Sequence, residues 1–151
     1  MRRTRPEERE IVPDVRYNSE VVSSFINRIM RRGKKSTATT SVYGAMDIMA
    51  EKTGKNPMEV FEQALKNVGP LMEVRPRRVG GATYQVPMEV PADRKSTLAM
   101  RWIIEAAKAR TGKSFSEKLS AELLDASNNQ GAAVRKREET HKMAEANRAF
   151  S

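Results

Sequence analysis

The 151-residue chain contains no cysteine, and this absence excludes several classes of protein. Without thiols the chain forms no disulfide, holds no cysteine-ligated zinc or iron–sulfur cluster, and offers no thiol nucleophile. A small secreted fold held together by disulfides is therefore excluded. The composition fits a reducing compartment.

Long apolar runs are missing as well. The best run, Leu98 to Ile104, is interrupted by Arg101, whereas a membrane-spanning helix needs about 18 or more apolar residues. Glu7, Glu8 and Glu10 stand where a signal peptide has its apolar core. We expect neither a membrane span nor a secretory signal.

Histidine is nearly absent, which limits the chemistry that the chain can carry out. His141 is the only histidine, so a metal site with two histidines is impossible and no Ser–His–Asp relay is indicated. We expect His141 to be a surface or contact residue. The pairs Gly33-Lys34 and Gly112-Lys113 lack the glycine that a Walker A loop places five residues earlier. We therefore expect no enzyme, no metal, no cofactor and no small-molecule substrate.

Positive charge, by contrast, is abundant and unevenly placed. Lys and Arg number 28 against 19 Asp and Glu, a net charge of +9. Residues 1–35 carry +5 and residues 75–113 carry +6, whereas residues 36–74 carry −2 and residues 114–151 are neutral. Basic patches steer polyanions, while mixed charge mainly confers solubility. Nucleic acid is the partner that this distribution favours; a basic surface that is merely solvated is the alternative.

The first 18 residues show no hydrophobic period and are rich in Arg and Glu. Pro6 and Pro13 interrupt any regular element there. We expect residues 1–18 to form a basic extended arm that becomes ordered on a partner.

Six segments repeat apolar residues at the spacing of an amphipathic helix. Capping residues mark their ends, with serine or asparagine at N-termini and glycine at C-termini. The expected helices run from about Ser19 to Gly33, Ala38 to Gly54, Asn56 to Gly69, Asp93 to Arg110, Ser114 to Asn128 and Ala132 to Phe150. The last helix is polar on most faces, has little to bury beyond Val134, Met143 and Ala144, and needs a partner.

A β-hairpin is predicted over residues 72–90. Apolar and polar residues alternate over residues 82–90, as in a half-buried strand. Gly80-Gly81, a turn that tolerates positive φ, joins this run to the alternating residues before it. The expected fold class is mainly α: a bundle of six helices with one β-hairpin arm inserted between the third and fourth helices, in a single domain over residues 1–151.

One cluster of positive charge joins the arm to the end of the first predicted helix. It consists of Arg28, Arg31, Arg32, Lys34 and Lys35. Cations in a last helical turn stabilise the helix dipole, but five cations within eight residues exceed that need. We therefore favour phosphate binding over a purely capping role.

A second cluster lies on and after the hairpin, at Arg75, Arg77, Arg78, Arg94, Lys95 and Arg101. If Val74, Tyr84 and Val86 point inward, the arginines around the tip have no acidic neighbours within the hairpin to neutralise them. Such an arm is suited to entering a groove or bridging backbones, and a solvated surface hairpin is the alternative. For Tyr84, packing against the helices is favoured over stacking on a base.

Residues 67–87, NVGPLMEVRPRRVGGATYQVP, closely resemble the hairpin region of the family of ribosomal protein seven of the small subunit, bacterial type. Residues 31–35 (RRGKK), 99–104 (AMRWII) and 143–150 (MAEANRAF) resemble its other signatures, in the right order along nearly the whole chain. The family pattern usually continues a few residues further with a His-Tyr-Arg-Trp-like tail.

The resemblance implies a protein of the cytoplasmic ribosome, an organellar ribosome being the alternative. It would bind the 3′ major domain of the small-subunit ribosomal RNA (16S type) early in assembly and nucleate the head of the subunit. The hairpin and the C-terminal helix over residues 132–150 would face the exit-site transfer RNA and the messenger path, beside other ribosomal proteins. Some members also repress translation of their own operon.

Residue by residue, the resemblance and the basic clusters give two sets of expected contacts. Contacts to ribosomal RNA are expected at Arg2, Arg3, Arg5, Arg9, Arg28, Arg31, Arg32, Gly33, Lys34, Lys35, Arg75, Arg77, Arg78, Arg94, Lys95, Arg101 and Lys113. Positions near transfer or messenger RNA are expected at Gly80, Gly81, Lys142 and Arg148.

The expected mechanism is structural. Lys and Arg would displace counterions from phosphates and hold several RNA helices in one geometry, selected by shape rather than by base edges. Two rival readings remain open: a protein that bends DNA through its minor groove, and a basic adaptor whose last helix docks on an acidic protein.

Overall fold

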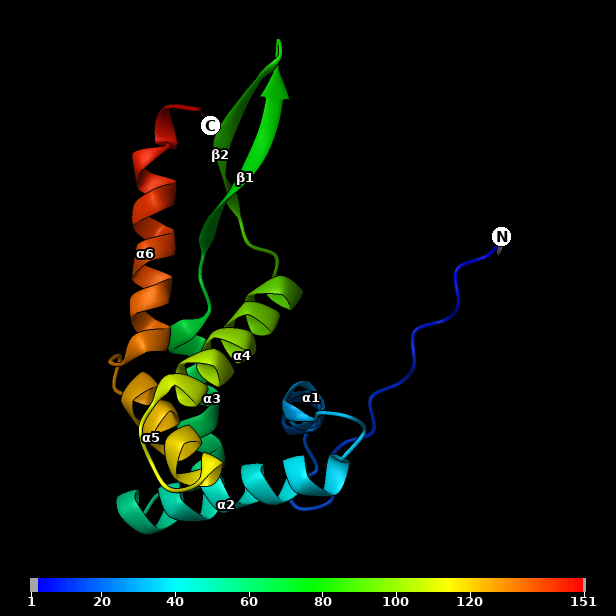
Figure 1. The fold of residues 1–151 in the computed structure, drawn as a ribbon, viewed down its shortest axis with the longest axis vertical. Helices are drawn as coiled ribbons and strands as arrows, with labels where there is room; N and C mark the ends of the chain where they lie inside the picture. Colours follow the sequence, from blue (N-terminus) through cyan, green and yellow to red (C-terminus); the bar gives the residue numbers. More distant parts are fainter. Residues whose placement is uncertain (1–2, 151) are drawn as a thin grey trace.

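The computed structural model describes residues 3–150, which form six α-helices and one antiparallel hairpin (Figure 1). The elements in chain order are α1 (Glu20–Ile29), α2 (Lys35–Thr53), α3 (Pro57–Val68), β1 (Met72–Val79), β2 (Ala82–Glu89), α4 (Ala92–Ala109), α5 (Phe115–Ser127), α6 (Ala132–Ala146) and the 3₁₀ turn η1 (Arg148–Phe150). The predicted fold class, mainly helical with the hairpin between the third and fourth helices, is confirmed.

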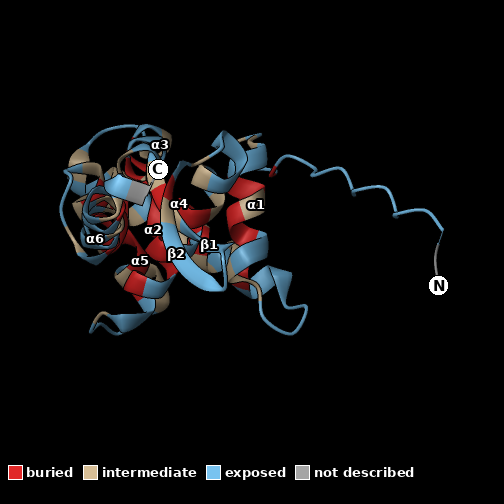
Figure 2. Ribbon diagram, turned by 90° about the horizontal axis from the view of Figure 1, so that it is seen from above, coloured by how far each residue is buried: buried red, intermediate tan, exposed pale blue. Residues whose placement is uncertain are grey.

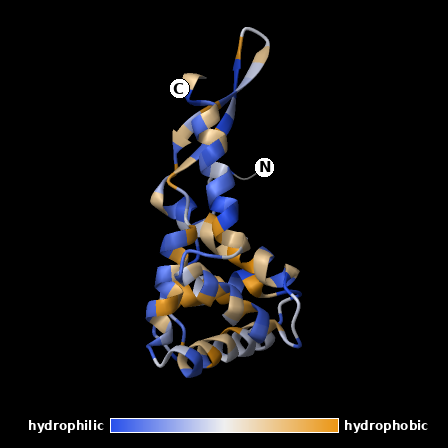
Figure 3. Ribbon diagram, turned by 90° about the vertical axis from the view of Figure 1, so that its left-hand side faces the viewer, coloured by the Kyte–Doolittle hydropathy of each residue, from blue (hydrophilic) through white to orange (hydrophobic). Residues whose placement is uncertain are grey.

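The core lies between the helices of the lower body, and the hairpin and the arm extend away from it (Figures 1 and 2). Phe25 of α1 and Phe61 of α3 are fully buried, with ring centroids 5.1 Å apart. The helix α4 contributes a broad buried face that includes Trp102 and Ile103. Figure 3, in which α6 faces the viewer, shows largely hydrophilic residues along that helix. Among residues 3–150, no helix is both long and apolar enough to span a membrane.

Local capping explains where three of the six α-helices of residues 3–150 begin. The Ser19 hydroxyl accepts a hydrogen bond from the Val22 N–H at 3.3 Å, and the Asn56 side chain accepts one from the Met58 N–H at 3.0 Å. The Ser114 hydroxyl likewise accepts from Glu117. These bonds satisfy N–H groups that lack a partner within the helix. The predicted N-caps at these positions are confirmed.

Two predicted helix ends are wrong. The helix α1 ends at Ile29 rather than at Gly33, because Met30 is extended and both Arg32 and Gly33 have positive φ, of 54° and 73°. The chain needs this turn to enter α2. At the other end of the chain, α6 ends at Ala146, where the Asn147 side chain donates to the Met143 carbonyl at 2.8 Å.

The hairpin has the predicted turn but not the predicted inward face. Gly80 and Gly81 both have positive φ, as a two-residue turn of this kind requires. The pairing sets Arg77 opposite Tyr84, and Val74 opposite Pro87. Because paired residues share a face, Val74 lies on the other face from Tyr84 and Val86, and the expectation that all three point inward is wrong.

The apolar side chains of the hairpin are correspondingly exposed. Tyr84 is 39% exposed, Met88 47% and Val79 55%. The face with Met72 and Pro87 is the one that meets α6, near its residue Ala144. A two-stranded hairpin is covered only where another element packs on it. The alternating pattern does not show which of its two faces that element covers. Met143 of α6, predicted to be among its few buried residues, is also exposed.

The arm is extended only over its first part. Residues 3–13 contain no helix or strand and are exposed, whereas Asp14 is buried. The Asp14 carboxylate accepts hydrogen bonds from the N–H groups of Tyr17 and Ser19, both at 2.8 Å, and from the Tyr43 hydroxyl of α2 at 2.8 Å. Residues 14–18 are therefore attached to the body, which shortens the predicted arm.

Candidate nucleic-acid interface

The first basic cluster lies in a loop rather than at a helix end. Of its five cations only Arg28 is in the last turn of α1, while Arg31, Arg32 and Lys34 belong to the connection and Lys35 begins α2. All five are exposed. The placement of Arg31 and Arg32 in the last turn of a helix is therefore wrong, and the helix dipole explains the position of Arg28 alone.

The basic residues of α4 extend this cluster. Arg94, Arg101 and Lys108 follow one another at intervals of seven residues, which is nearly two full helical turns, so they share one side of the helix. All three are exposed. Arg28 of α1 donates a hydrogen bond to the hydroxyl of Thr97 at 3.3 Å. The cations of α1, of the connection and of α4 therefore form one surface, which we call the basic face.

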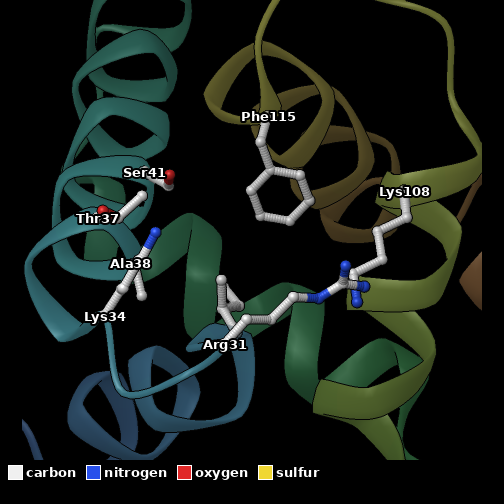
Figure 4. A pocket seen from close by; sticks show the side chains of 8 residues that line it. Arg31, Lys34, Thr37, Ala38, Ser41, Lys108 and Phe115 are labelled. Atoms are coloured by element: carbon white, nitrogen blue, oxygen red, sulfur yellow. The ribbon is translucent and has the colours of Figure 1, made fainter.

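A pocket of about 340 Å³ opens within the basic face, between α2, α4 and the start of α5 (Figure 4). Its lining includes three cations, Arg31, Lys34 and Lys108, and one aromatic ring, that of Phe115. No acidic residue is among those that line it. The tertiary structure thus brings together the predicted residues Arg31 and Lys34 with two residues that the sequence did not single out.

Lys108 and Phe115 carried only a weak signal in the sequence. Lys108 lies outside the apolar stripe of α4 and seven residues after Arg101. This spacing would have placed Lys108 on the same side of the helix as Arg101. Phe115 follows the N-cap Ser114 and is half-buried. Nothing in the local pattern indicates that its ring lines the same pocket as Arg31 and Lys34.

The second basic cluster is partly neutralised by one carboxylate. Glu73 of β1 is buried and accepts hydrogen bonds from Arg94 at 2.6 and 3.0 Å and from Arg75 at 3.2 Å. The bonds from Arg94 are the main reason that the pKa of Glu73 is lowered. The expectation that the hairpin arginines have no acidic neighbour is therefore wrong for Arg75.

The outer arginines of the hairpin, Arg77 and Arg78, are not neutralised by an acidic side chain of residues 3–150. Arg77 and Arg78 are exposed, and neither takes part in an ion pair among residues 3–150. Lys95, predicted with them, lies instead with its side-chain stem against Gly69, at the end of α3. The cluster thus divides into a paired part at the base of the hairpin and an unpaired part nearer its tip.

The residues expected near transfer RNA lie at the opposite end of the molecule from α2. Gly80 and Gly81 form the exposed tip of the hairpin, and α6 runs beside β1 (Figure 1). Lys142 is exposed on α6, and Arg148 in η1 is 3.1 Å from Glu145. The structure therefore brings the hairpin and the C-terminal segment together.

The remaining predicted contacts are spread over the ends and loops. Arg3, Arg5 and Arg9 are exposed on the extended part of the arm, and Arg2 lies outside the described residues. Lys113 is exposed between α4 and α5, where its backbone N–H donates to Glu117. None of these is brought into the pocket.

His141 is a contact residue, as expected. Its Nε2 accepts a hydrogen bond from the Leu71 N–H at 2.9 Å, which joins α6 to the residue before β1. Burial lowers the pKa of His141 from its ordinary value of 6.5, and the charge of Arg137 lowers it further. The neutral imidazole is the form that accepts this bond.

We expect the free energy of unfolding to fall as the pH drops below about 6.5. The folded state holds His141 neutral to a lower pH than the unfolded state does, so it binds fewer protons. The contribution is complete above the unfolded pKa and is lost as the pH falls through the folded pKa. Urea denaturation between about pH 7.5 and pH 5.5 measures it.

The matched control for this effect is His141→Gln, in which the decline over the same pH range should be smaller. Asp14 and Glu73 also have lowered pKa values, but their ordinary values are 3.8 and 4.5, so they act at lower pH. For Asp14 burial raises the pKa, and the hydrogen bonds from Tyr17, Ser19 and Tyr43 outweigh it. Equal pH dependence in the two proteins would contradict the assignment to His141.

Comparison with known proteins identifies a family for this arrangement. Residues 1–148 match the family model described as Ribosomal protein S7p/S5e. The chain is 62% identical over 149 residues to the small ribosomal subunit protein uS7 of Dehalococcoides mccartyi, covering 99% of this chain and 96% of that protein. It is 60% identical over 150 residues to the protein of the same name from Xanthobacter autotrophicus, with the same coverage, and 61% identical over 145 residues to that of a Thermoanaerobacter species, covering 96% and 93%. The chain therefore belongs to the Ribosomal protein S7p/S5e family, a family of structural ribosomal proteins and not of enzymes.

Proposed function

We propose that the chain is a structural constituent of the small subunit of a cytoplasmic ribosome, where its basic face binds ribosomal RNA. The observation that carries this proposal is the set of exposed cations that α1, α4 and the connection before α2 bring onto one surface. The RNA that we propose is the 3′ major domain of the small-subunit RNA. By holding its helices in one geometry early in assembly, the chain would nucleate the head of the subunit.

The physical basis of binding is the release of counterions. Each phosphate that a Lys or Arg neutralises releases condensed cations, and the gain does not depend on base sequence. The helical body holds the cations of the basic face at fixed separations, so an RNA whose phosphates match those separations binds best. Selection by the shape of a folded RNA follows from this.

The hairpin and α6 supply the second part of the proposal. Their common end, with Gly80, Gly81, Lys142 and Arg148, is proposed to lie near the exit-site transfer RNA and the messenger, and beside other proteins of the head and platform. Arg77 and Arg78, which are exposed and in no ion pair with any other residue of 3–150, support it, because they place charge near the tip of an arm that extends from the body (Figure 1). Binding of its own messenger would allow the chain to repress its own translation.

The double variant Lys34→Ala with Lys35→Ala is expected to weaken RNA binding with little change in melting temperature. Both lysines are exposed and neither belongs to the core. Loss of two phosphate contacts should lower the slope of log K against log salt by about two. Binding to a transcript of the 3′ major domain, with thermal melting of the free protein, measures both effects.

The matched control is Lys52→Ala with Lys55→Ala, two exposed lysines of which Lys52 is in the last turn of α2 and Lys55 follows that helix. This control should bind like the parent protein. A large fall in melting temperature with unchanged RNA binding would show that Lys34 and Lys35 are structural, against the proposal. Equal affinity for duplex DNA at the same salt would favour a DNA-bending protein, and a native complex that survives nuclease treatment would favour a protein adaptor.

A further inference from the structure

We propose that the pocket between α2, α4 and α5 receives one unstacked nucleotide of the bound RNA, with its base against the ring of Phe115 and its phosphates at the cationic rim. This inference rests on the proposed RNA-binding function and names a subsite within the basic face. The sequence predicted phosphate contacts on this surface, but it did not predict a cavity or a base contact.

The inner wall of the pocket is suited to a flat apolar group. Ile29, Ala38 and Phe115 line it, and Ala38 is buried while Phe115 is half-buried. Figure 4 shows the ring of Phe115 pointing into the space between α2 and α4. The volume of about 340 Å³ is near the lower end of the range of about 300–1,000 Å³ for small-ligand pockets. Bases that leave a stack commonly rest on aromatic side chains.

The rim of the pocket is suited to an anion. Arg31 and Lys34 come from the connection before α2 and Lys108 from the last turn of α4; all three are exposed, and none takes part in an ion pair among residues 3–150. Figure 4 shows Arg31 and Lys108 extending toward each other across the opening. Like charges that face each other are unfavourable unless an anion lies between them. The phosphates on either side of an unstacked nucleotide meet this requirement.

Two hydroxyl groups line the wall without a partner in the described part of the chain. The hydroxyls of Thr39 and Thr40 on α2 donate to backbone carbonyls of their own helix, at 2.8 and 2.9 Å. Thr37 and Ser41, which line the pocket, make no such side-chain bond among residues 3–150. Their hydroxyls can therefore donate to, or accept from, the edge of a base or the 2′-hydroxyl of a ribose.

The combination distinguishes a nucleotide from a simple anion. A phosphate alone would use the rim and leave the wall with Phe115 empty, whereas an apolar ligand would leave three cations unpaired. A nucleotide satisfies both parts at once. The base would lie inward, against the apolar wall, and the phosphates would lie outward, at the charged rim of the mouth.

The test is the affinity of the full chain for a transcript of the 3′ major domain of small-subunit RNA, measured at several salt concentrations. Phe115→Leu, which keeps an apolar side chain but removes the ring, should weaken binding about fivefold to 150-fold with an unchanged salt slope. Phe115→Tyr keeps the ring and should bind like the parent protein. Lys108→Gln should weaken binding and lower the salt slope by about one.

The matched control for Lys108→Gln is Lys52→Gln, since each lysine is the basic residue in the last turn of its helix. Thermal melting without RNA separates loss of binding from loss of folding, because Phe115 also packs against the core. Parent-like binding by Phe115→Leu overturns the proposal. If Lys108→Gln weakens binding and Phe115→Leu does not, the pocket binds a phosphate and no base, and the proposal is overturned as well. In either case, weak binding by the Lys34/Lys35 double variant would leave the proposed function intact. No binding of structured RNA by the parent protein would overturn both.

Discussion

Raising the salt concentration from about 50 to about 200 mM is expected to weaken binding to small-subunit RNA by about 10³- to 10⁵-fold. Neutralisation of roughly six to ten phosphates produces an effect of this size, and we expect roughly eight to ten. The structure offers enough free cations. The exposed Lys and Arg residues of the basic face and the outer hairpin that take part in no ion pair among residues 3–150 are Arg28, Arg31, Arg32, Lys34, Lys35, Arg77, Arg78, Arg101 and Lys108.

Paired cations should contribute less to this salt dependence. Arg75 and Arg94 already bind the Glu73 carboxylate, so they bring less net charge to the RNA. We therefore expect Arg101→Ala to lower the salt slope more than Arg94→Ala does. Fluorescence anisotropy of labelled RNA at several salt concentrations measures the slope directly. A flat response to salt would mean that charge does not drive binding, and the proposed mechanism would be wrong.

Arg110→Ala is expected to lower the free energy of unfolding by about 3–5 kcal/mol. Arg110 caps α4 and pairs with Glu122 of α5, whose side chain is 1% exposed, at 3.2 Å, and also with Asp125. Removing the guanidinium leaves a buried carboxylate without its charge partner. The remaining bond to Glu122, from the Ala133 N–H at 2.9 Å, does not supply a full positive charge.

The consequence should be visible in the melting temperature as a fall of about 6–20 °C for a chain of this size. Urea denaturation at neutral pH gives the free energy itself. The matched control is Arg101→Ala, an exposed arginine of the same helix in no ion pair of residues 3–150, with an expected change within about 0.5 kcal/mol. A loss below about 1 kcal/mol for Arg110→Ala would place this pair among ordinary surface ion pairs.

The same ion pair has a functional consequence. Arg110 follows α4, Glu122 lies on α5, and Ala133 lies in the first turn of α6. The bonds that Glu122 makes with Arg110 and with the Ala133 N–H therefore hold the start of α6 against the body. The helix α6 in turn packs beside β1. Weakening these bonds to Glu122 should loosen the end of the molecule that carries the hairpin. The cations of α1 and of the connection before α2 should stay in place.

The local elements could be predicted from the sequence because their signals are local. Helix starts follow from side chains that cap the next few N–H groups, as at Ser19, Asn56 and Ser114. The hairpin turn follows from two glycines that accept positive φ. The resemblance carried by residues 67–87 identified the family, and the uneven charge indicated a polyanionic partner.

Errors arose where the outcome depends on residues far apart in the chain. The inward face of the hairpin depends on α6, which begins more than forty residues after the hairpin ends, so alternation along one strand was not enough. The charge of Arg75 depends on Glu73 and its bonds to Arg94. The helix α1 ends before Gly33 because the chain has to turn into α2. Gly33 indicated that a turn was present but not how many residues before it belong to that turn.

The sequence by itself therefore determined the helices, the hairpin turn, the excess of positive charge and the family. Only the tertiary structure decided which cations are neutralised, which side of the hairpin is covered, that Glu122 is buried, and that Phe115 and Lys108 share a pocket with Arg31 and Lys34. The physical reason is that backbone conformation follows from neighbouring residues, whereas burial and pairing follow from contacts that exist only after distant segments have packed together.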